Sequence, residues 1–197
     1  MRKLTSICVF CGSSEGNDIQ IIETAKELGK ALANHNIELV YGAAKIGIMG
    51  LIANATLAHK GKVTGIVPTF LKLKEVVHLG LTELIVTKNM HERKLLMQNK
   101  SDAFITMPGG IGTMEELFEI LTWLQLGLHS KPIGLLNVNH YYDDLIVMLQ
   151  KMVEKGFLSK DNLKLLIVDD QIDTLLEKMG NFKAPQKSKL LTNEQRC

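Results

Sequence analysis

Short apolar runs alternate with longer amphipathic segments along most of this 197-residue chain, and this alternation constrains the fold more than any other feature. The apolar runs are continuous, which is typical of strands buried on both faces of a parallel sheet. The amphipathic segments between them predict helices that connect one strand to the next. The expected strands are residues 5–10, 37–41, 63–67, 84–87, 103–107, 132–137 and 165–168, and the expected helices are residues 18–34, 48–59, 90–100, 113–126, 142–155 and 171–179.

This pattern predicts an α/β fold with one doubly wound parallel sheet of about seven strands and helices on both faces. The length of the chain fits a single domain, which we place at residues 1–182. Hydrophobic periodicity is lost from residue 183 on, so we expect residues 183–197 to form a mobile C-terminal tail.

Charge and aromatic content argue against two classes of partner. Lysine and arginine number 23 and aspartate and glutamate 21, so the net charge is only +2. Such a small excess gives no electrostatic reason to expect DNA or a membrane surface as a partner. Aromatic residues make up 5% of the chain, which is too few for a base-stacking groove. No stretch approaches 18 consecutive apolar residues, so no membrane span is expected. From charge, aromatic content and hydropathy together, we expect neither nucleic acid nor a membrane as a partner.

The cysteines bear on the compartment and on redox chemistry. There are three, Cys8, Cys11 and Cys197, and an odd, low count without a signal peptide indicates a reducing cytoplasm. Cys8 and Cys11 form a C-x-x-C pair, but Cys8 lies inside an apolar run, whereas a redox thiol is activated at a helix N-terminus. A structural role is therefore favoured. Further metal ligands at suitable spacing are lacking, and we expect no metal or cofactor.

Three glycine-rich loops, residues 11–16, 42–50 and 108–113, each follow an expected strand and precede an expected helix. Ligands of open α/β sheets bind at the carboxyl ends of the strands, and glycine lets a backbone approach a ligand closely. The free amides and positive dipole at the start of each helix favour an anion, most naturally a phosphate. Each loop alone is also consistent with a simple tight turn. A P-loop run is absent, and the first loop has only two glycines of a dinucleotide fingerprint.

The helix after the third loop carries an acidic cluster. Thr113 and Glu116 are three residues apart, so they share one face of its first turn, at the mouth of the expected phosphate site. Glu115, Glu116 and Glu119 are also what the dipole of a helix start favours by itself. A carboxylate beside a bound phosphate is repelled by it, however, and this indicates a compensating cation or a catalytic use.

Arg93 is the candidate for that cation. Asn89 is a plausible N-cap of the preceding expected helix, and Arg93 shares a stripe with Met90 and Met97. An inward-facing arginine usually has an anionic partner, because burying an unpaired charge is costly. A surface position for Arg93 is equally compatible with the sequence, and Lys94 fits a solvated face.

Together these residues resemble the LONELY GUY (LOG) family of nucleoside 5′-monophosphate phosphoribohydrolases, often mislabelled as lysine decarboxylases. The resemblance runs through residues 9–14, 41–51, 90–94, 108–116 and 122–127 and covers roughly residues 5–170. The combination of P-G-G-x-G-T-x-x-E with M-H-x-R-K is far more specific than a single glycine loop.

The resemblance implies a Rossmann-like domain that hydrolyses the N-glycosidic bond of adenosine 5′-monophosphates, N6-modified or not, to a free base (cytokinin or adenine) and ribose 5-phosphate. It implies a cytoplasmic homodimer that needs no cofactor. Arg93 and Glu116 match the family's catalytic pair. The implied substrate-binding residues are Gly109, Gly110, Ile111, Gly112, Thr113, Glu115, Lys94, Met90, Glu75, Ser13, Gly42 and Thr122.

The sequence departs from the family pattern in one loop, and two other functions are open to it. The second loop, usually three glycines in the family, reads Gly42-Ala43-Ala44, and the added methyl groups are expected to narrow the approach of the backbone to a ligand. A non-catalytic nucleotide carrier or sensor would use the same phosphate site. A pyridoxal-phosphate decarboxylase would need a Schiff-base lysine, and no lysine here has a distinctive setting for it.

Overall fold

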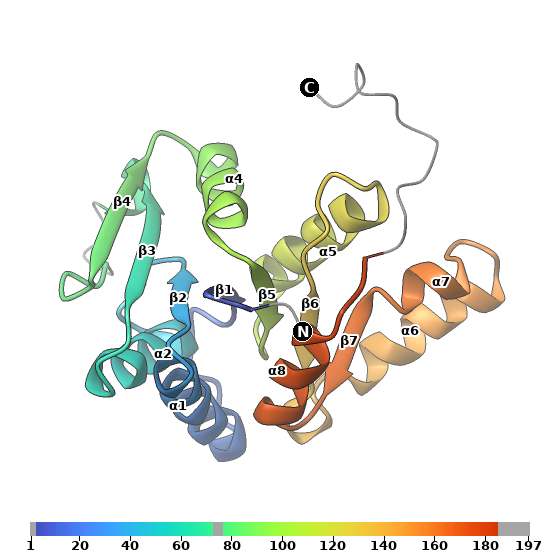
Figure 1. The fold of residues 1–197 in the computed structure, drawn as a ribbon, viewed down its shortest axis with the longest axis horizontal. Coiled ribbons are helices and arrows are strands. Elements are labelled where there is room, and N and C mark those ends of the chain that lie inside the picture. The colour runs from blue at the N-terminus through green and yellow to red at the C-terminus, as the bar shows by residue number, and fades with distance from the viewer. Residues whose placement is uncertain (1–2, 73–76, 185–197) are drawn as a thin grey trace.

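A seven-stranded parallel sheet forms the centre of the computed structural model, which describes residues 3–72 and 77–184 (Figure 1). Its strand order, β4-β3-β2-β1-β5-β6-β7, confirms the expected fold class. Most of the expected tail, residues 185–197, lies outside the described residues. The strands are β1 (Ser6–Phe10), β2 (Glu38–Tyr41), β3 (Val63–Pro68), β4 (Glu83–Thr87), β5 (Ala103–Thr106), β6 (Ile133–Leu136) and β7 (Leu166–Asp169).

All the expected helices are present, and three short ones were not foreseen. The longer helices are α1 (Ile19–Asn34), α2 (Gly47–Ala58), α4 (Met90–Lys100), α5 (Ile111–Gln125), α6 (Asp143–Glu154) and α8 (Ile172–Gly180). The short ones are α3 (Thr69–Lys72), α7 (Lys160–Leu163) and the 3₁₀ turn η1 (Val138–His140), all too brief to show a helical period. Within the described residues, no helix is both long and apolar enough to cross a membrane.

The core has two halves, one on each face of the sheet. Alternate residues of β1 divide between them, with Ile7 and Val9 on one face and Cys8 and Phe10 on the other. Helices α1, α2 and α8 cover the first face, and α4, α5 and α6 cover the second (Figure 1). Cys8 and Cys11 are both buried, and burial raises the pKa of both thiols, which suits a structural role.

The strand order reverses next to β1, and this reversal locates the binding crevice. Strands β2, β3 and β4 extend the sheet on one side of β1, and β5, β6 and β7 extend it on the other. The connections that follow β1 and β5 therefore leave toward opposite faces and open a crevice at the carboxyl edge, where ligands of such sheets bind. The first and third glycine loops follow these two strands.

Helix α5 begins two residues earlier than its sequence predicts. Gly110 is its N-cap, in an extended conformation, and Ile111 and Gly112 form its first turn together with Thr113. The low helix propensity of glycine favoured the later start. The earlier start brings the N-terminus of the helix, with its unbonded amides, directly to the third glycine loop.

Helices α1 and α2 pack closely through Gly29, and this contact generates a stability prediction. A Cβ at Gly29 would lie 2.8 Å from the Ala55 Cβ and even closer to the Ile52 carbonyl. We expect Gly29→Ala to lower the free energy of unfolding by about 1–3 kcal/mol, because a packed interface tolerates added volume poorly. Urea denaturation measures the change.

The matched control for this experiment is Lys30→Ala, on the exposed face of the same helix, which should change the free energy of unfolding by about 0.5 kcal/mol or less. Helix propensity alone predicts the opposite sign for Gly29→Ala, a gain of about 1 kcal/mol. A stabilised Gly29→Ala variant would therefore contradict the close α1–α2 contact.

Candidate active site

The three glycine loops are hydrogen-bonded to one another at the carboxyl edge of the sheet. The Gly12 amide donates to the Pro108 carbonyl at 3.1 Å, which joins the first loop to the third. The amides of Ile48 and Met49, at the start of α2, donate to the carbonyls of Ser14 and Gly12 at 3.4 and 3.3 Å. The first loop thus bridges the other two, and a displacement of one loop is transmitted to its neighbours.

The glycines of the third loop have different physical roles. A Cβ at Gly109 would meet the Thr113 hydroxyl and, at 2.8 Å, the Gly12 amide nitrogen, so packing within the protein requires glycine there. A Cβ at Gly110 or Gly112 would meet nothing within 4 Å. Protein packing therefore does not explain these two glycines, which leave open space in front of the helix.

The open space faces unbonded amides. Met114 is the first residue of α5 whose amide bonds back along the helix, to the Gly110 carbonyl at 3.1 Å. Among the described residues, the amides of residues 110–113 have no hydrogen-bond acceptor. They lie at the positive end of a 15-residue helix, and we call this group of amides the anion site. Its geometry and polarity suit a phosphate group.

Arg93 is buried beside the anion site and points inward from the first turn of α4. The Asn89 side chain caps this helix by accepting from the Glu92 amide at 2.9 Å. Only 7% of Arg93 is exposed. Its Nε donates to the Ile66 carbonyl on β3 at 3.1 Å, and its Nη1 donates to Glu116 Oε1 at 3.0 Å. Both interactions fix the guanidinium over the end of β3.

Glu116 accepts the hydrogen bond from Arg93 in a largely water-shielded position. Its side chain is 14% exposed. Burial raises the pKa of Glu116 above its ordinary value, while the charge and hydrogen bond of Arg93 work against that rise. The sequence leaves the partner of Arg93 open, and in the structure that partner is Glu116. Within the described residues, the structure has no cluster of three or more histidine, cysteine, aspartate or glutamate side chains that could hold a metal ion.

Gly42 provides the space that Arg93 occupies. A Cβ at this position would clash with Arg93 Nη2 and would lie 3.1 Å from the Met49 sulfur. Any side chain at position 42 would therefore displace the guanidinium. The structure thus gives a physical reason for glycine at position 42, and contact of Gly42 with a substrate stays a prediction.

The methyl group of Ala43 does not extend into the crevice, so the expected narrowing by this residue is not seen. Ala43 is fully buried in a small cluster with Val67 and Val77. A Cβ added to Gly65 would lie 2.8 Å from the Cβ of Ala43. The Ala43 backbone has a φ of 64°, which is unusual for a residue other than glycine. Ala44 is buried as well and forms an isolated bridge with Val77.

Lys94 joins α4 to α5 instead of lying on a solvated face. Its ammonium group contacts Glu115 at 2.5 Å and Glu119 at 2.7 Å, and only 12% of the side chain is exposed. Partial burial opposes the charged form, yet the two glutamates hold the pKa of Lys94 above its usual value. Lys94 and Arg93 together attach the start of α4 to the second and third turns of α5.

The remaining predicted substrate-binding residues are distributed more widely. Ser13 is exposed in the first loop, and Met90 is half-buried at the start of α4. Thr122 lies about 14 Å along α5 from Thr113, and its hydroxyl donates to the Phe118 carbonyl at 2.7 Å. Glu75 lies outside the described residues. The structure therefore brings Ser13 and Met90 to the crevice edge but not Thr122.

Two tyrosines at the site were not identified from the sequence. The hydroxyls of Tyr141 and Tyr142 donate to the carbonyls of Gly109 and Met107, both at 2.7 Å. They follow β6, so their position at the carboxyl end of a strand was an available signal. The hydrophobic pattern instead assigned Tyr142 to the start of the next helix.

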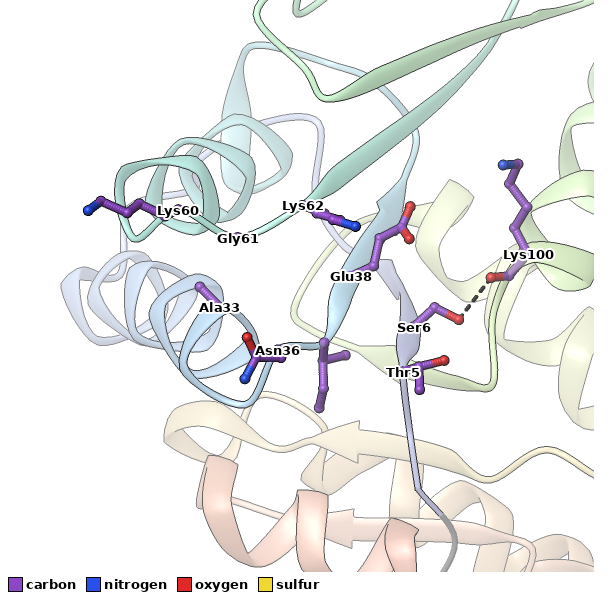
Figure 2. Close-up of a pocket in the computed structure, with 10 residues that line it drawn as sticks. Thr5, Ser6, Ala33, Asn36, Glu38, Lys60, Gly61, Lys62 and Lys100 are labelled. Carbon is purple, nitrogen blue, oxygen red and sulfur yellow. Dashed lines mark hydrogen bonds between the residues drawn. The ribbon is translucent and has the colours of Figure 1, made fainter.

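A basic pocket of about 560 Å³ lies at the opposite, amino edge of the sheet (Figure 2). Lys60, Lys62 and Lys100 line it together with Glu38, and Ser6 donates to the Lys100 carbonyl at 2.9 Å. Helices α1, α2 and α4 end here, so the helix ends at this pocket carry partial negative charge. The lysines offset that charge, and the helix starts that favour an anion lie at the other edge.

Comparisons with known proteins agree with this geometry. A protein-family model described as "possible lysine decarboxylase" matches residues 49–179. The cytokinin riboside 5′-monophosphate phosphoribohydrolase LOG1 of Arabidopsis thaliana is 42% identical over 192 residues, which are 98% of this chain and 90% of that protein. The chain belongs to the LOG family. A probable LOG enzyme of Oryza sativa subsp. japonica, LOGL1, is 44% identical over 176 residues, covering 89% of this LOG chain and 79% of the rice protein.

Solved structures resemble this LOG chain in fold. The molybdenum cofactor binding protein from Rippkaea orientalis has a TM-score of 0.68 and 22% identity, over 92% of this chain and 98% of that one. The Moco carrier protein from Chlamydomonas reinhardtii has a TM-score of 0.62 and 20% identity, over 88% and 98%. At such identities the likeness establishes the shared fold and nothing about the ligand.

The contact between Gly42 and Arg93 predicts how a methyl group at position 42 affects Glu116. We expect Gly42→Ala to push the guanidinium away from Glu116 and so to raise the pKa of this carboxyl further, because Arg93 favours its charged form. A pH titration of the Glu116 carboxyl carbon by NMR measures the change. The Glu116→Gln variant identifies the resonance.

The matched control is Ala43→Gly, next in the same loop, whose methyl group contacts Val67 and Val77 and not Arg93. It should leave the pKa of Glu116 where it is. If Gly42→Ala also leaves this pKa unchanged, Arg93 does not depend on the empty space at position 42.

Proposed function

We propose that this LOG-family chain hydrolyses the N-glycosidic bond of adenosine 5′-monophosphates, N6-modified or not, and releases the free base and ribose 5-phosphate. The observation that carries the proposal is that α5 bears both the anion site at its start and the partly buried Glu116 further along. The relatives above, named for this reaction on cytokinin riboside 5′-monophosphates, support it. The chain is then a hydrolase of N-glycosyl compounds.

In this proposal the anion site binds the 5′-phosphate. The amides of residues 110–113, which have no acceptor among the described residues, bind the phosphate together with the positive end of the helix dipole. Glu116 lies five residues after Ile111, about 8 Å further along the helix axis. A pentose 5-phosphate can span that interval, so binding of the phosphate orients the reacting carbon toward Glu116.

Glu116 supplies the negative charge for the reaction. Cleavage of an N-glycosidic bond develops positive charge on the ribose, as glycoside hydrolysis does. An ionised Glu116 stabilises this charge and orients or deprotonates the attacking water. Its raised pKa makes it a better base than an exposed glutamate.

Arg93 acts by positioning Glu116. A guanidinium remains protonated in proteins and cannot serve as a general acid. Its Nε and Nη1 already donate to Ile66 and Glu116, which leaves the group committed to holding the carboxylate in place. Lys94 supports the same helix through Glu115 and Glu119. Direct contact of Lys94 with substrate remains a prediction from the family resemblance.

We further propose that the protein forms a homodimer through the exposed side of α5. Ile111 is 91% exposed, Phe118 37% and Leu126 48%, and Leu95 on the neighbouring α4 is 51% exposed. Large apolar side chains that gather on one surface typically mark a protein interface. A second copy of the chain, which the family resemblance implies, would cover this surface beside the active site.

The free cysteines support a reducing compartment, and we propose the cytoplasm. Cys8 and Cys11 are both buried thiols, and neither is in a disulfide. Secreted proteins commonly use such residues for disulfides, whereas reducing compartments keep them as thiols.

The first test of the function is the release of base. Incubation with AMP and with an isoprenoid-modified AMP, followed by chromatography, should show free base from the wild-type protein. Glu116→Gln should lower turnover at least about 100-fold while nucleotide binding is retained, because the charge that stabilises the transition state is lost.

The matched control is Glu119→Gln on the same helix, which contacts Lys94 and not Arg93, and which should keep most of its turnover. Unchanged turnover in Glu116→Gln would reject the assignment of this residue. Tight nucleotide binding without any release of base by the wild-type protein would favour the carrier instead.

The dimer has its own test. Phe118→Glu places a charge in the proposed interface and should convert the protein to a monomer in sedimentation velocity. Phe157→Glu is the control, because Phe157 is 87% exposed but lies beyond the end of α6, away from α5. Equal sedimentation of the wild-type protein and Phe118→Glu would place the interface elsewhere or exclude it.

A further inference from the structure

The hydroxyl of Tyr141 donates a 2.7 Å hydrogen bond to the carbonyl of Gly109, next to the anion site. Tyr141 lies 32 residues further along the chain, just after η1, and is 49% exposed. The proposed mechanism gives this tyrosine no part. Its hydrogen bond nevertheless reaches the peptide group that precedes the first amide of the anion site.

The geometry of a peptide group makes this bond consequential. In a planar trans peptide the C=O and the N–H point in opposite directions, so a bond that holds the Gly109 carbonyl also sets the direction of the Gly110 amide. Glycines on both sides would otherwise let this peptide rotate easily. A Cβ at Gly110 would meet open space, so protein packing offers no restraint of its own there.

The turn that presents Tyr141 is held in a strained conformation. Asn139 and His140 have φ values of 46° and 61°, which are costly for residues other than glycine. The side-chain amide of Asn139 donates to the carboxylate of Asp18, the N-cap of α1, at 2.7 Å. The Asn137 side chain accepts from the Tyr142 backbone at 2.7 Å. Such strain persists only where surrounding contacts enforce it, and it is concentrated at functional sites.

Tyr142 provides an internal comparison. Its hydroxyl also donates at 2.7 Å, but to the Met107 carbonyl, and it is only 2% exposed. The two rings meet edge to face, with centroids 4.9 Å apart and planes at 85°. Adjacent tyrosines thus make equal hydrogen bonds, one within the core and one on the peptide that leads into the anion site.

We infer that Tyr141 is a positioning residue, whose hydroxyl holds the Gly109–Gly110 peptide so that the Gly110 amide faces the phosphate. The identity of that phosphate as the 5′-phosphate of a nucleotide rests on the proposed function. The inference itself concerns binding of the phosphate and not the cleavage step.

The test uses Tyr141→Phe and Tyr142→Phe, which remove one hydroxyl each and retain the ring. Calorimetric titration with ribose 5-phosphate measures binding, steady-state assays with the nucleotide measure kcat and KM, and thermal unfolding measures stability. We expect Tyr141→Phe to bind ribose 5-phosphate about three- to tenfold more weakly, because one hydrogen bond no longer orients the peptide. KM should rise by a similar factor and kcat should change less than about twofold, which is the signature of lost uniform binding.

Tyr142→Phe should lower the melting temperature and leave binding of ribose 5-phosphate unchanged. The inference is overturned if Tyr141→Phe binds as tightly as the wild type, if both variants weaken binding equally, or if kcat falls while KM stays constant. Absence of ribose 5-phosphate binding by the wild-type protein overturns it too. If the wild type binds ribose 5-phosphate but releases no base, the proposed function fails, and the calorimetric comparison still decides the role of Tyr141.

Discussion

The partly buried ion pair between Arg93 and Glu116 determines much of the surrounding structure. Two charges withdrawn from water need close geometry and additional hydrogen bonds, or the pair destabilises the fold. The Ile66 carbonyl supplies one such bond, and the bare backbone of Gly42 leaves room for the guanidinium. Helices α4 and α5 must therefore meet at one fixed position over the second face of the sheet. Because Arg93 is buried, it needs an anionic partner within hydrogen-bond distance, and this requirement sets the position of the Glu116 carboxylate.

The two edges of the sheet differ electrostatically for a simple topological reason. In a parallel sheet the helices all return in the same direction, so most helix starts lie at the carboxyl edge and most helix ends at the amino edge. The carboxyl edge has unbonded amides and the three joined glycine loops. The amino edge has the lysine-lined pocket. The same backbone geometry thus favours an anion at one edge and needs cationic side chains at the other.

The sequence predicts the elements and the crevice well because both depend on local patterns. Continuous apolar runs identify all seven strands, and the Asn89 cap marks the start of α4. The methionine stripe makes Arg93 a candidate for an inward position but does not exclude a surface one. The partners of Lys94 and the hydroxyl contact of Tyr141 join residues 21 to 32 positions apart, which periodicity does not encode. The direction of the Ala43 methyl depends on a left-handed backbone angle that its residue type does not suggest. The family resemblance supplies roles for these residues but not their contacts.

In the proposed function helix α5 carries both the phosphate-binding amides and the reacting carboxylate, and a helix is nearly incompressible along its axis. The distance between Ile111 and Glu116 along the helix axis is therefore fixed at about 8 Å. A hexose 6-phosphate, with one more carbon in its skeleton, would present its anomeric centre out of register with the carboxylate even though its phosphate could still dock. Under the proposed function, helical rise would therefore contribute to the selection of five-carbon sugars.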